Sequence, residues 1–288
     1  MSWWKKNSTT IILILIAVVG AGLIAYPTFA DWWNGFHQTR AVNTYVSVAS
    51  DLGNEKYRMM INEAERYNDA LAVSGVKWNL TEEEKAEYSS VLEVTDTGMM
   101  AYIDIPKVHI TLPIYHGTEE KVLQVAVGHI AGTSLPVGGA GTHCVLSGHR
   151  GLPSAKLFTD IDKLAEGDTF TITVLDRTLT YEVDQIHIVL PYELNDLSIE
   201  PDRDLCTLVT CTPYGVNTHR LLVRGHRIEN AQGEVNVIAD ALQVEPVYIA
   251  PFIALPLLFL LFIHMLVTSS SAKRRFTKLR LIEEEITS

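Results

Sequence analysis

The sequence predicts a mostly β protein. We expect a closed or nearly closed β-barrel of about eight short strands with short helices, preceded by a helical segment and flanked by two transmembrane helices. Between residues 100 and 228, short runs rich in β-branched residues alternate with turn residues. Over 39–72, apolar residues instead recur at spacings of three and four, as in an amphipathic helix. The apolar stretches 11–30 and 247–267 each have the length of about 20 residues that crosses a bilayer.

These patterns divide the chain of 288 residues into seven segments. In order, they are a cytoplasmic N-terminus (1–10), a transmembrane helix or signal-anchor (11–30), a helical segment (31–98), the β-barrel (99–230), a linker (231–246), a second transmembrane helix (247–267) and a basic cytoplasmic tail (268–288).

The first apolar stretch, 11–30, has the features of a membrane anchor. Tryptophan pairs at 3–4 and 32–33 bracket it, as aromatic residues do at the two faces of a bilayer. A cleaved signal peptide is the alternative, because Thr28-Phe29-Ala30 fits a small-residue cleavage site. We favour an uncleaved anchor, since the apolar stretch is long for the core of a signal peptide.

Charge is distributed unevenly along the chain. Residues 31–246 carry 16 Lys and Arg against 31 Asp and Glu, a balance of −15 within a whole-chain charge of −11. Lys5 and Lys6 precede the first apolar stretch, and five basic residues follow the second between positions 273 and 280. Because cationic flanks stay on the cytoplasmic side, we expect a protein of the cell membrane with 31–246 outside the cell. The acidic balance argues against nucleic acid as a partner and leaves the lipid bilayer as one.

Two or three helices are expected before the barrel. The amphipathic pattern of 39–72 is interrupted near Gly53-Asn54. Residues 73–80 form a loop. Thr81 then begins a short helix, with Glu84 three residues later completing a capping box.

The barrel strands are separated by turn residues. We expect strands at 100–105, 110–114, 142–147, 169–174, 179–190, 205–210 and 219–228. Two of the connections, 128–132 and 154–164, are expected to contain short helices.

The stretch 205–227 holds the strongest functional signal. It is a strand, a turn-rich loop and a second strand, and the resulting hairpin brings Arg220 beside Cys211 at a strand end. Upstream, Ser147-Gly148-His149-Arg150-Gly151 supplies an imidazole directly after another apolar run. A thiol, an imidazole and a guanidinium are the groups that thiol-mediated acyl transfer needs. A cysteine on an apolar strand is otherwise most often a packing residue.

Four ordered runs resemble a known protein family. They are Leu-Pro-Ile-Tyr-His-Gly-Thr at 112–118, Ser-Gly-His-Arg-Gly at 147–151, Thr-Leu-Val-Thr-Cys-Thr-Pro-Tyr-Gly at 207–215 and Asn-Thr-His-Arg-Leu-Leu-Val-Arg-Gly at 217–225. Together they resemble the sortases, in particular the pilin-polymerising class C sortases of Gram-positive bacteria. The resemblance covers residues 100–228 and implies a sortase-like barrel.

This resemblance implies roles for three residues. Cys211 would cleave an LPxTG-like sorting signal after its Thr and hold a thioacyl intermediate. His149 would transfer the protons, and Arg220 would hold the oxyanion or the substrate backbone. The partners would be pilin subunits that carry sorting signals and acceptor lysines. Arg224, about 13 Å further along the same strand face, should matter much less.

One feature of the class is missing from the sequence. Class C sortases usually carry an Asp-Pro-Trp or Asp-Pro-Phe lid over the active site, and this chain contains no Asp-Pro. Trp78 lies where a lid is expected, so it either plugs the site or packs the helical segment against the barrel. Thr210 and Tyr214 are further candidates for substrate-binding or lid residues.

Two other functions remain open. The first is a sortase that attaches proteins to peptidoglycan, and the second is a catalytically silent scaffold that binds pilins. The presence of Cys211, His149 and Arg220 together disfavours the scaffold. We expect no cofactor and no metal, because no metal-ligand spacing is present.

The three cysteines are not expected to form disulfides readily. Cys206 and Cys211 are five residues apart on one strand, so they point to opposite faces and cannot bridge. Cys144 and Cys206 would be neighbours if their strands paired in parallel register. We favour two separate buried thiols, since a buried free cysteine behaves as a small hydrophobic residue.

Overall fold

The computed structural model describes residues 3–95, 97–230 and 259. The predicted linker at 231–246, the basic tail and all but one residue of the predicted second transmembrane helix lie outside these residues. The described residues 3–28 belong to one compact unit, and residues 29–95 with 97–230 belong to a second. The functional residues expected from the sequence all belong to the second unit.

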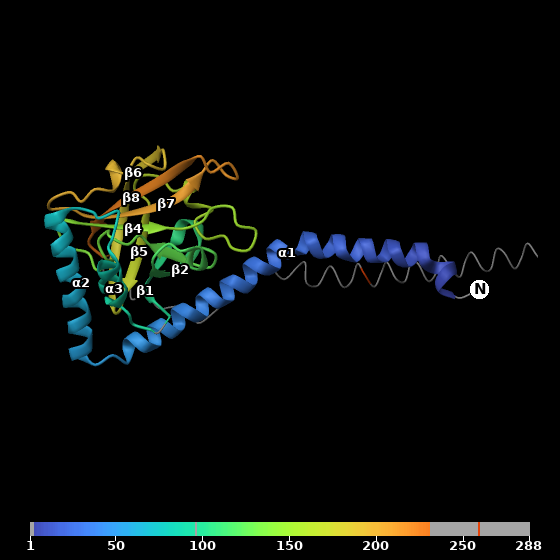
Figure 1. Cartoon of the computed structure of the whole chain (residues 1–288), viewed down its shortest axis with the longest axis horizontal. Coiled ribbons are helices and arrows are strands. Elements are labelled where there is room, and N and C mark those ends of the chain that lie inside the picture. The colour runs from blue at the N-terminus through green and yellow to red at the C-terminus, as the bar shows by residue number, and fades with distance from the viewer. Residues whose placement is uncertain (1–2, 96, 231–258, 260–288) are drawn as a thin grey trace, which may run out of the picture. The chain divides into compact units, whose positions relative to one another are not determined.

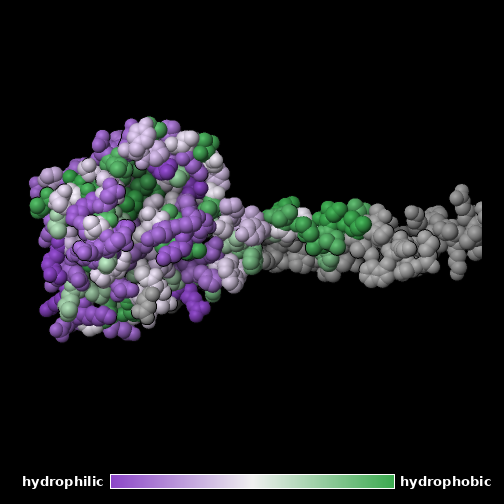
Figure 2. Space-filling model, in the orientation of Figure 1, coloured by the Kyte–Doolittle hydropathy of each residue, from purple (hydrophilic) through white to green (hydrophobic). Residues whose placement is uncertain are grey.

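The N-terminal helix α1 runs from Trp3 to Ser50 (Figure 1). It contains the predicted span 11–30, includes Pro27, and continues without a break into the amphipathic segment. Within the described part of the chain, it is the one helix whose length and composition suit a membrane span, with a mean hydropathy of 1.5 over its best window in 15–50. The coloured side chains of the first part of α1 are largely hydrophobic in Figure 2, whereas the surface around the barrel is mostly hydrophilic.

Two shorter helices follow, as predicted. Helix α2 (Asn54–Ser74) begins after Gly53, where the sequence indicated a break. Helix α3 (Glu82–Ser90) begins with the predicted capping box: Glu84 N donates to Thr81 Oγ1, and Thr81 N donates to Glu84 Oε2.

Eight strands close into the predicted barrel (Figure 1), in the order β1-β2-β3-β4-β7-β8-β6-β5. Their bounds are β1 Met99–Ile105, β2 Ile110–His116, β3 Val127–His129, β4 Thr142–Ser147, β5 Thr169–Val174, β6 Arg177–Val189, β7 Asp204–Thr212 and β8 His219–Ile228. The connections hold the short helix α4 (Glu120–Leu123) and the 3-10 turns η1 (Pro106–Val108), η2 (Ile161–Lys163) and η3 (Asn195–Leu197).

The expectation of a short helix over 128–132 is wrong, because 128 and 129 are in a strand and 130–132 contain no helix. Gly128 and His129 belong to β3, which pairs in parallel with β2 and antiparallel with β4. The backbones approach closely here, because a Cβ at Gly128 would lie 2.2 Å from the carbonyl oxygen of Gly117. The glycine thus permits the close approach of the two backbones. A strand of three residues is also too short to show a clear alternation of apolar and polar residues in the sequence. In the other connection, 154–164, the only described helical turn is η2.

Helix α1 is fastened to the barrel by Tyr45. This side chain is fully buried, its hydroxyl donates to Met100 O, and it accepts a hydrogen bond from Leu175 N. Desolvation therefore raises the pKa of Tyr45 far above its ordinary value. The pair of bonds satisfies the buried hydroxyl and links α1 to the start of the barrel and to the β5–β6 turn.

Candidate active site

Cys211 lies near the end of β7, directly opposite Arg220 on β8. The antiparallel register of the two strands pairs these residues, as the predicted hairpin requires. The strand is buried through Thr210, whereas Cys211 is partly exposed and its thiol is free. The β-branched run thus delivers a thiol to the point where the strand emerges from the core.

His149 is brought to the same end of β7 by β4. The two strands are parallel, with Ser147 paired to Val209, and Gly148 N donates to Val209 O over 3.1 Å. Two residues further, the chains reach His149 and Cys211. The imidazole is 29% exposed, and its Nε2 lies 3.8 Å from Glu120 Oε2 on α4.

The guanidinium of Arg220 is held against its own loop. Its Nη1 donates to the carbonyl oxygens of Asn217 at 3.3 Å and His219 at 3.1 Å. These bonds orient the side chain at the end of the hairpin where the loop joins β7 to β8. Five N–H donors in a planar fork suit such a group to binding a carboxylate, a carbonyl or an oxyanion.

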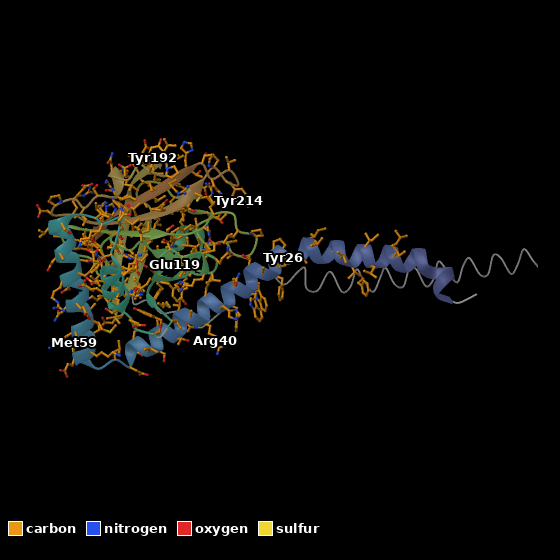
Figure 3. All side chains as sticks on the ribbon, viewed as in Figure 1. Tyr26, Arg40, Met59, Glu119, Tyr192 and Tyr214 are labelled. Atoms are coloured by element: carbon orange, nitrogen blue, oxygen red, sulfur yellow. The ribbon has the colours of Figure 1, made fainter. Side chains whose placement is uncertain are left out.

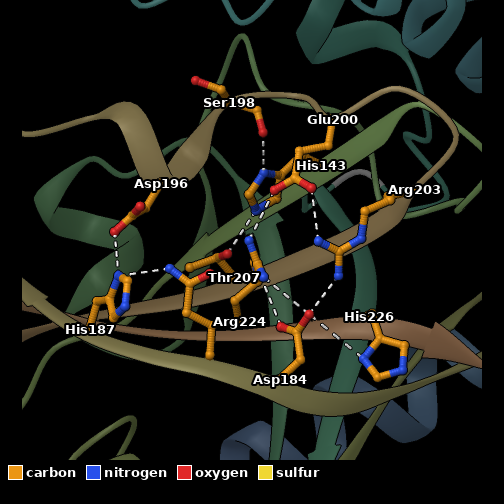
Figure 4. Close-up of polar contacts among 11 residues, drawn as sticks. His143, Asp184, His187, Asp196, Ser198, Glu200, Arg203, Thr207, Arg224 and His226 are labelled. Atoms are coloured by element: carbon orange, nitrogen blue, oxygen red, sulfur yellow. Dashed lines mark hydrogen bonds and ion pairs between the residues drawn. The ribbon is translucent and has the colours of Figure 1, made fainter.

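Arg224, the internal comparison, has a different environment (Figure 4). It pairs across the sheet with Thr207, four residues before Cys211. Its Nε donates to Asp184 Oδ1 over 2.9 Å, and its Nη1 donates to Glu200 Oε1 over 3.0 Å. Burial alone would raise the pKa of Asp184, but the arginines around it bring that pKa below its ordinary value. Arg224 therefore belongs to a structural ion-pair cluster.

His143 lies in the same cluster and not beside Cys211. Its Nδ1 contacts Ser198 O at 2.8 Å, and its Nε2 contacts Thr207 Oγ1 at 2.7 Å (Figure 4). Burial lowers the pKa of His143. An imidazole with a proton on Nδ1 alone satisfies both contacts, because the Thr207 hydroxyl then donates to Nε2. The choice of His149 over His143 as the acid–base candidate agrees with this placement.

The sequence interpretation missed Arg150. Its side chain is 11% exposed, and it joins the His149 loop to the end of β7: Nη1 donates to Thr212 Oγ1 over 3.1 Å. Nη2 is paired with Asp162. The buried Nε has no hydrogen-bond partner among the residues that the structure describes. The position of Arg150 next to His149 in the run 147–151 indicated that it could belong to the site. Its partner Thr212, however, is 62 residues away in the sequence.

Thr210 and Tyr214 occupy different environments. Thr210 is 2% exposed and its hydroxyl donates to Gly148 O over 2.7 Å, so it joins β7 to the residue that follows β4. Its role in substrate binding stays a prediction. Tyr214 is 61% exposed on the β7–β8 loop (Figure 3). Gly151, with a φ of +79°, packs against this ring so closely that a Cβ there would lie 2.9 Å from it. The loops of His149 and Tyr214 therefore touch.

Trp78, the lid candidate, is 39% exposed. The preceding residue, Lys77, is held by two interactions. Its backbone N donates to Gly132 O over 3.0 Å, and its side chain forms an ion pair with Glu84. Gly132 belongs to the connection between β3 and β4, which hydrogen bonds to the beginning of β4. It does not belong to the loop after β4, which holds His149. The lid role of Trp78 stays a prediction.

Cys144 and Cys206 are buried and unbridged, as favoured from the sequence, but the expectation that the two thiols lie apart is wrong. They are paired in the parallel register of β4 and β7, at 2% and 0% exposure, and both are free. Burial and the adjacent Cys144 raise the pKa of the Cys206 thiol well above its ordinary value. These thiols are too buried to attack a substrate. No group of three or more His, Cys, Asp or Glu in residues 3–95 and 97–230 could hold a metal ion.

Comparisons with known proteins agree with this geometry. A family model described as "Sortase domain" matches residues 103–228. Sortase D of Bacillus subtilis is 30% identical over 159 residues, which are 54% of this chain and 75% of that protein.

Solved structures give higher identities. Sortase C1 from Streptococcus agalactiae is 54% identical with a TM-score of 0.66, over 67% of this chain and 100% of that one. Sortase C from Clostridium perfringens, solved with the C-terminal cell wall sorting motif, is 41% identical with a TM-score of 0.59, over 66% of this chain and 99% of that one.

Proposed function

The chain belongs to the sortase family, and we propose that it is a membrane-anchored, extracellular cysteine transpeptidase of class C that polymerises pilins. The observation that carries this proposal is the pairing of Cys211 with Arg220 at the end of β7 that His149 also approaches. The names of the two similar structures reported above, a sortase C1 and a sortase C, support the class.

The proposed reaction begins with Cys211. Its thiolate attacks the Thr carbonyl carbon of an LPxTG-like sorting signal, and Arg220 donates hydrogen bonds to the developing oxyanion. The C–N bond to the following Gly breaks as His149 gives a proton to the departing amine. A thioacyl enzyme remains.

The second half of the reaction resolves this thioester. A lysine amine of another pilin subunit attacks the same carbonyl, and His149 accepts the proton that the amine loses. The C–S bond breaks, the thiolate of Cys211 is restored, and an isopeptide bond joins the two subunits. No cofactor is needed, because both bonds are broken by polar steps.

The acceptor separates this function from the attachment of proteins to peptidoglycan. With a sorting-signal peptide as donor, we expect a pilin-derived lysine peptide to be ligated in preference to an amine taken from peptidoglycan stem peptides. Preference for the peptidoglycan amine would assign the chain to cell-wall anchoring, while leaving the thioacyl chemistry intact.

The anchor and the lid are two finer proposals. Helix α1 is proposed to hold the barrel at the membrane, together with a second span at 247–267, of which the structure describes residue 259 alone. Trp78 is proposed to gate the site. Trp78→Ala should then raise peptide turnover, and unchanged or lower turnover in a folded variant would assign Trp78 to packing alone.

A further inference from the structure

We propose that one face of α1, formed by Asp31, Asn34 and Gln38, positions His149 by holding the two segments that flank its imidazole. We call these three residues the brace. The inference rests on the proposed function, because it assigns positioning residues to the same reaction.

Each brace residue makes a hydrogen bond to a connection between strands of the barrel. Asn34 Nδ2 donates to Ser154 O over 2.8 Å. Lys156 N donates to Asp31 Oδ1 over 2.9 Å. The third bond, from Gln38 Nε2 to Val125 O, is 2.7 Å long. All three are bonds between a side chain and a distant backbone group, so they report a specific fit and not a local helix contact.

The brace is one stripe of the helix. Residues three, four and seven apart lie on the same face of an α-helix, and 31, 34 and 38 follow this spacing. They are half-buried, whereas the intervening residues 32, 33, 36 and 37 are exposed. The stripe continues to Val42 and Tyr45, which are buried against the core. The apolar residues Val42 and Tyr45 therefore pack α1 against the core. The polar brace residues extend this contact towards the N-terminus of the helix.

The bonds end on the loop that begins with His149 and on the segment that follows α4. Ser154 and Lys156 lie in the loop that begins with the imidazole, and this loop closes where Phe158 N donates to His149 O over 3.1 Å. Val125 follows α4, which carries Glu120, the acidic neighbour of His149. Holding these two segments at once fixes the imidazole relative to its carboxylate neighbour. Small misplacements of a catalytic group cost up to about a hundredfold in rate.

Isosteric substitutions test the brace in the full chain, purified in detergent. Asn34→Asp and Gln38→Glu keep size but replace each amide donor by a carboxylate that cannot donate to a carbonyl. We expect the double variant to lower kcat about five- to tenfold with KM unchanged, since misplacement affects the chemical step more than binding. Asp31→Asn should retain activity, because its amide oxygen still accepts from Lys156 N.

Arg40→Ala is the matched control, since Arg40 is exposed on the same helix outside the brace (Figure 3). It should leave kcat, KM and the unfolding temperature unchanged. An equal loss of kcat in Arg40→Ala would overturn the proposal, as would a double variant with unchanged kcat.

Hydrogen–deuterium exchange gives a readout that does not depend on activity. In the double variant, amides of 148–160 and 119–126 should exchange faster, while those of β7 and β8 stay unchanged. Unchanged exchange in both segments would contradict the brace even if the wild type transferred no peptide. An inactive wild type with the expected exchange would instead contradict the proposed function alone.

Discussion

Cys211 and Arg220 face each other across the antiparallel register of β7 and β8, and Arg220 is hydrogen bonded to the carbonyls of its own loop. Arg224 on the same strand is instead enclosed by Asp184 and Glu200. Two arginines four residues apart therefore have different environments. The first is available at the end of the hairpin, and the second joins strands.

This contrast predicts different effects of the same substitution. Arg220→Lys should lower kcat/KM for a sorting-signal peptide about a hundredfold, because an ammonium lacks the planar fork and the loss of one oxyanion donor costs about 10²–10³ in rate. Arg224→Lys should change kcat/KM less than about threefold but lower the unfolding temperature, because it weakens bonds to two carboxylates. Steady-state peptide cleavage and thermal unfolding measure both. Equal losses of kcat/KM would refute the assignment.

Arg150 and Thr212 should act as a pair. Their hydrogen bond joins the residues next to His149 and Cys211, so removing either partner should loosen both loops. A double-mutant cycle of Arg150→Ala and Thr212→Val in kcat/KM should give a coupling energy of about 0.5–3 kcal/mol, as residues in one hydrogen-bond network do. Additive effects would show that the bond contributes nothing to the site.

Acid should destabilise the barrel through His143. Burial puts the pKa of His143 below its ordinary value of 6.5, so between that value and the folded one the unfolded state binds more protons. Stability is therefore full above pH 6.5 and falls as the pH is lowered towards the folded pKa. The unfolding temperature of the wild type should drop between pH 7 and 5 more steeply than that of His143→Gln. Parallel curves would exclude His143 as a source of this dependence.

The paired thiols make a simple chemical prediction. Cys144, Cys206 and Cys211 are free, so denatured and unreduced protein should contain three titratable thiols. Adjacent parallel strands lie about 4.8 Å apart, which is within the range of Cα separations that a disulfide spans. A titre of one thiol would therefore mean that Cys144 and Cys206 are bridged.

The hairpin at the site was predictable because its information is local. The β-branched run into Cys211, the turn residues after it and the return through Arg220 lie within one short stretch. The capping box at Thr81 is equally local. Such elements follow from neighbouring residues and keep their form in the folded chain.

Contacts between distant segments were harder to predict. The parallel pairing of β4 with β7 brings Cys144 beside Cys206 across 62 positions, and sequence spacing offered it only as one alternative. Strand β3 is three residues long and contains a glycine, so it shows no periodicity. Arg150 was not predicted as a site residue, because its place in the site depends on a hydrogen bond to the distant Thr212. The brace was not predicted, because the partner of Asn34 lies 120 residues away in the sequence.

The most direct test of the thioacyl mechanism is the intact mass of the full chain after incubation with LPxTG-like peptides. We expect a mass gain equal to the acyl fragment in the wild type and none in Cys211→Ala. A folded wild type that gains no mass, with pilin-derived peptides and also in the Trp78→Ala background, would contradict the thioacyl mechanism. The silent scaffold would then be the better description of this chain.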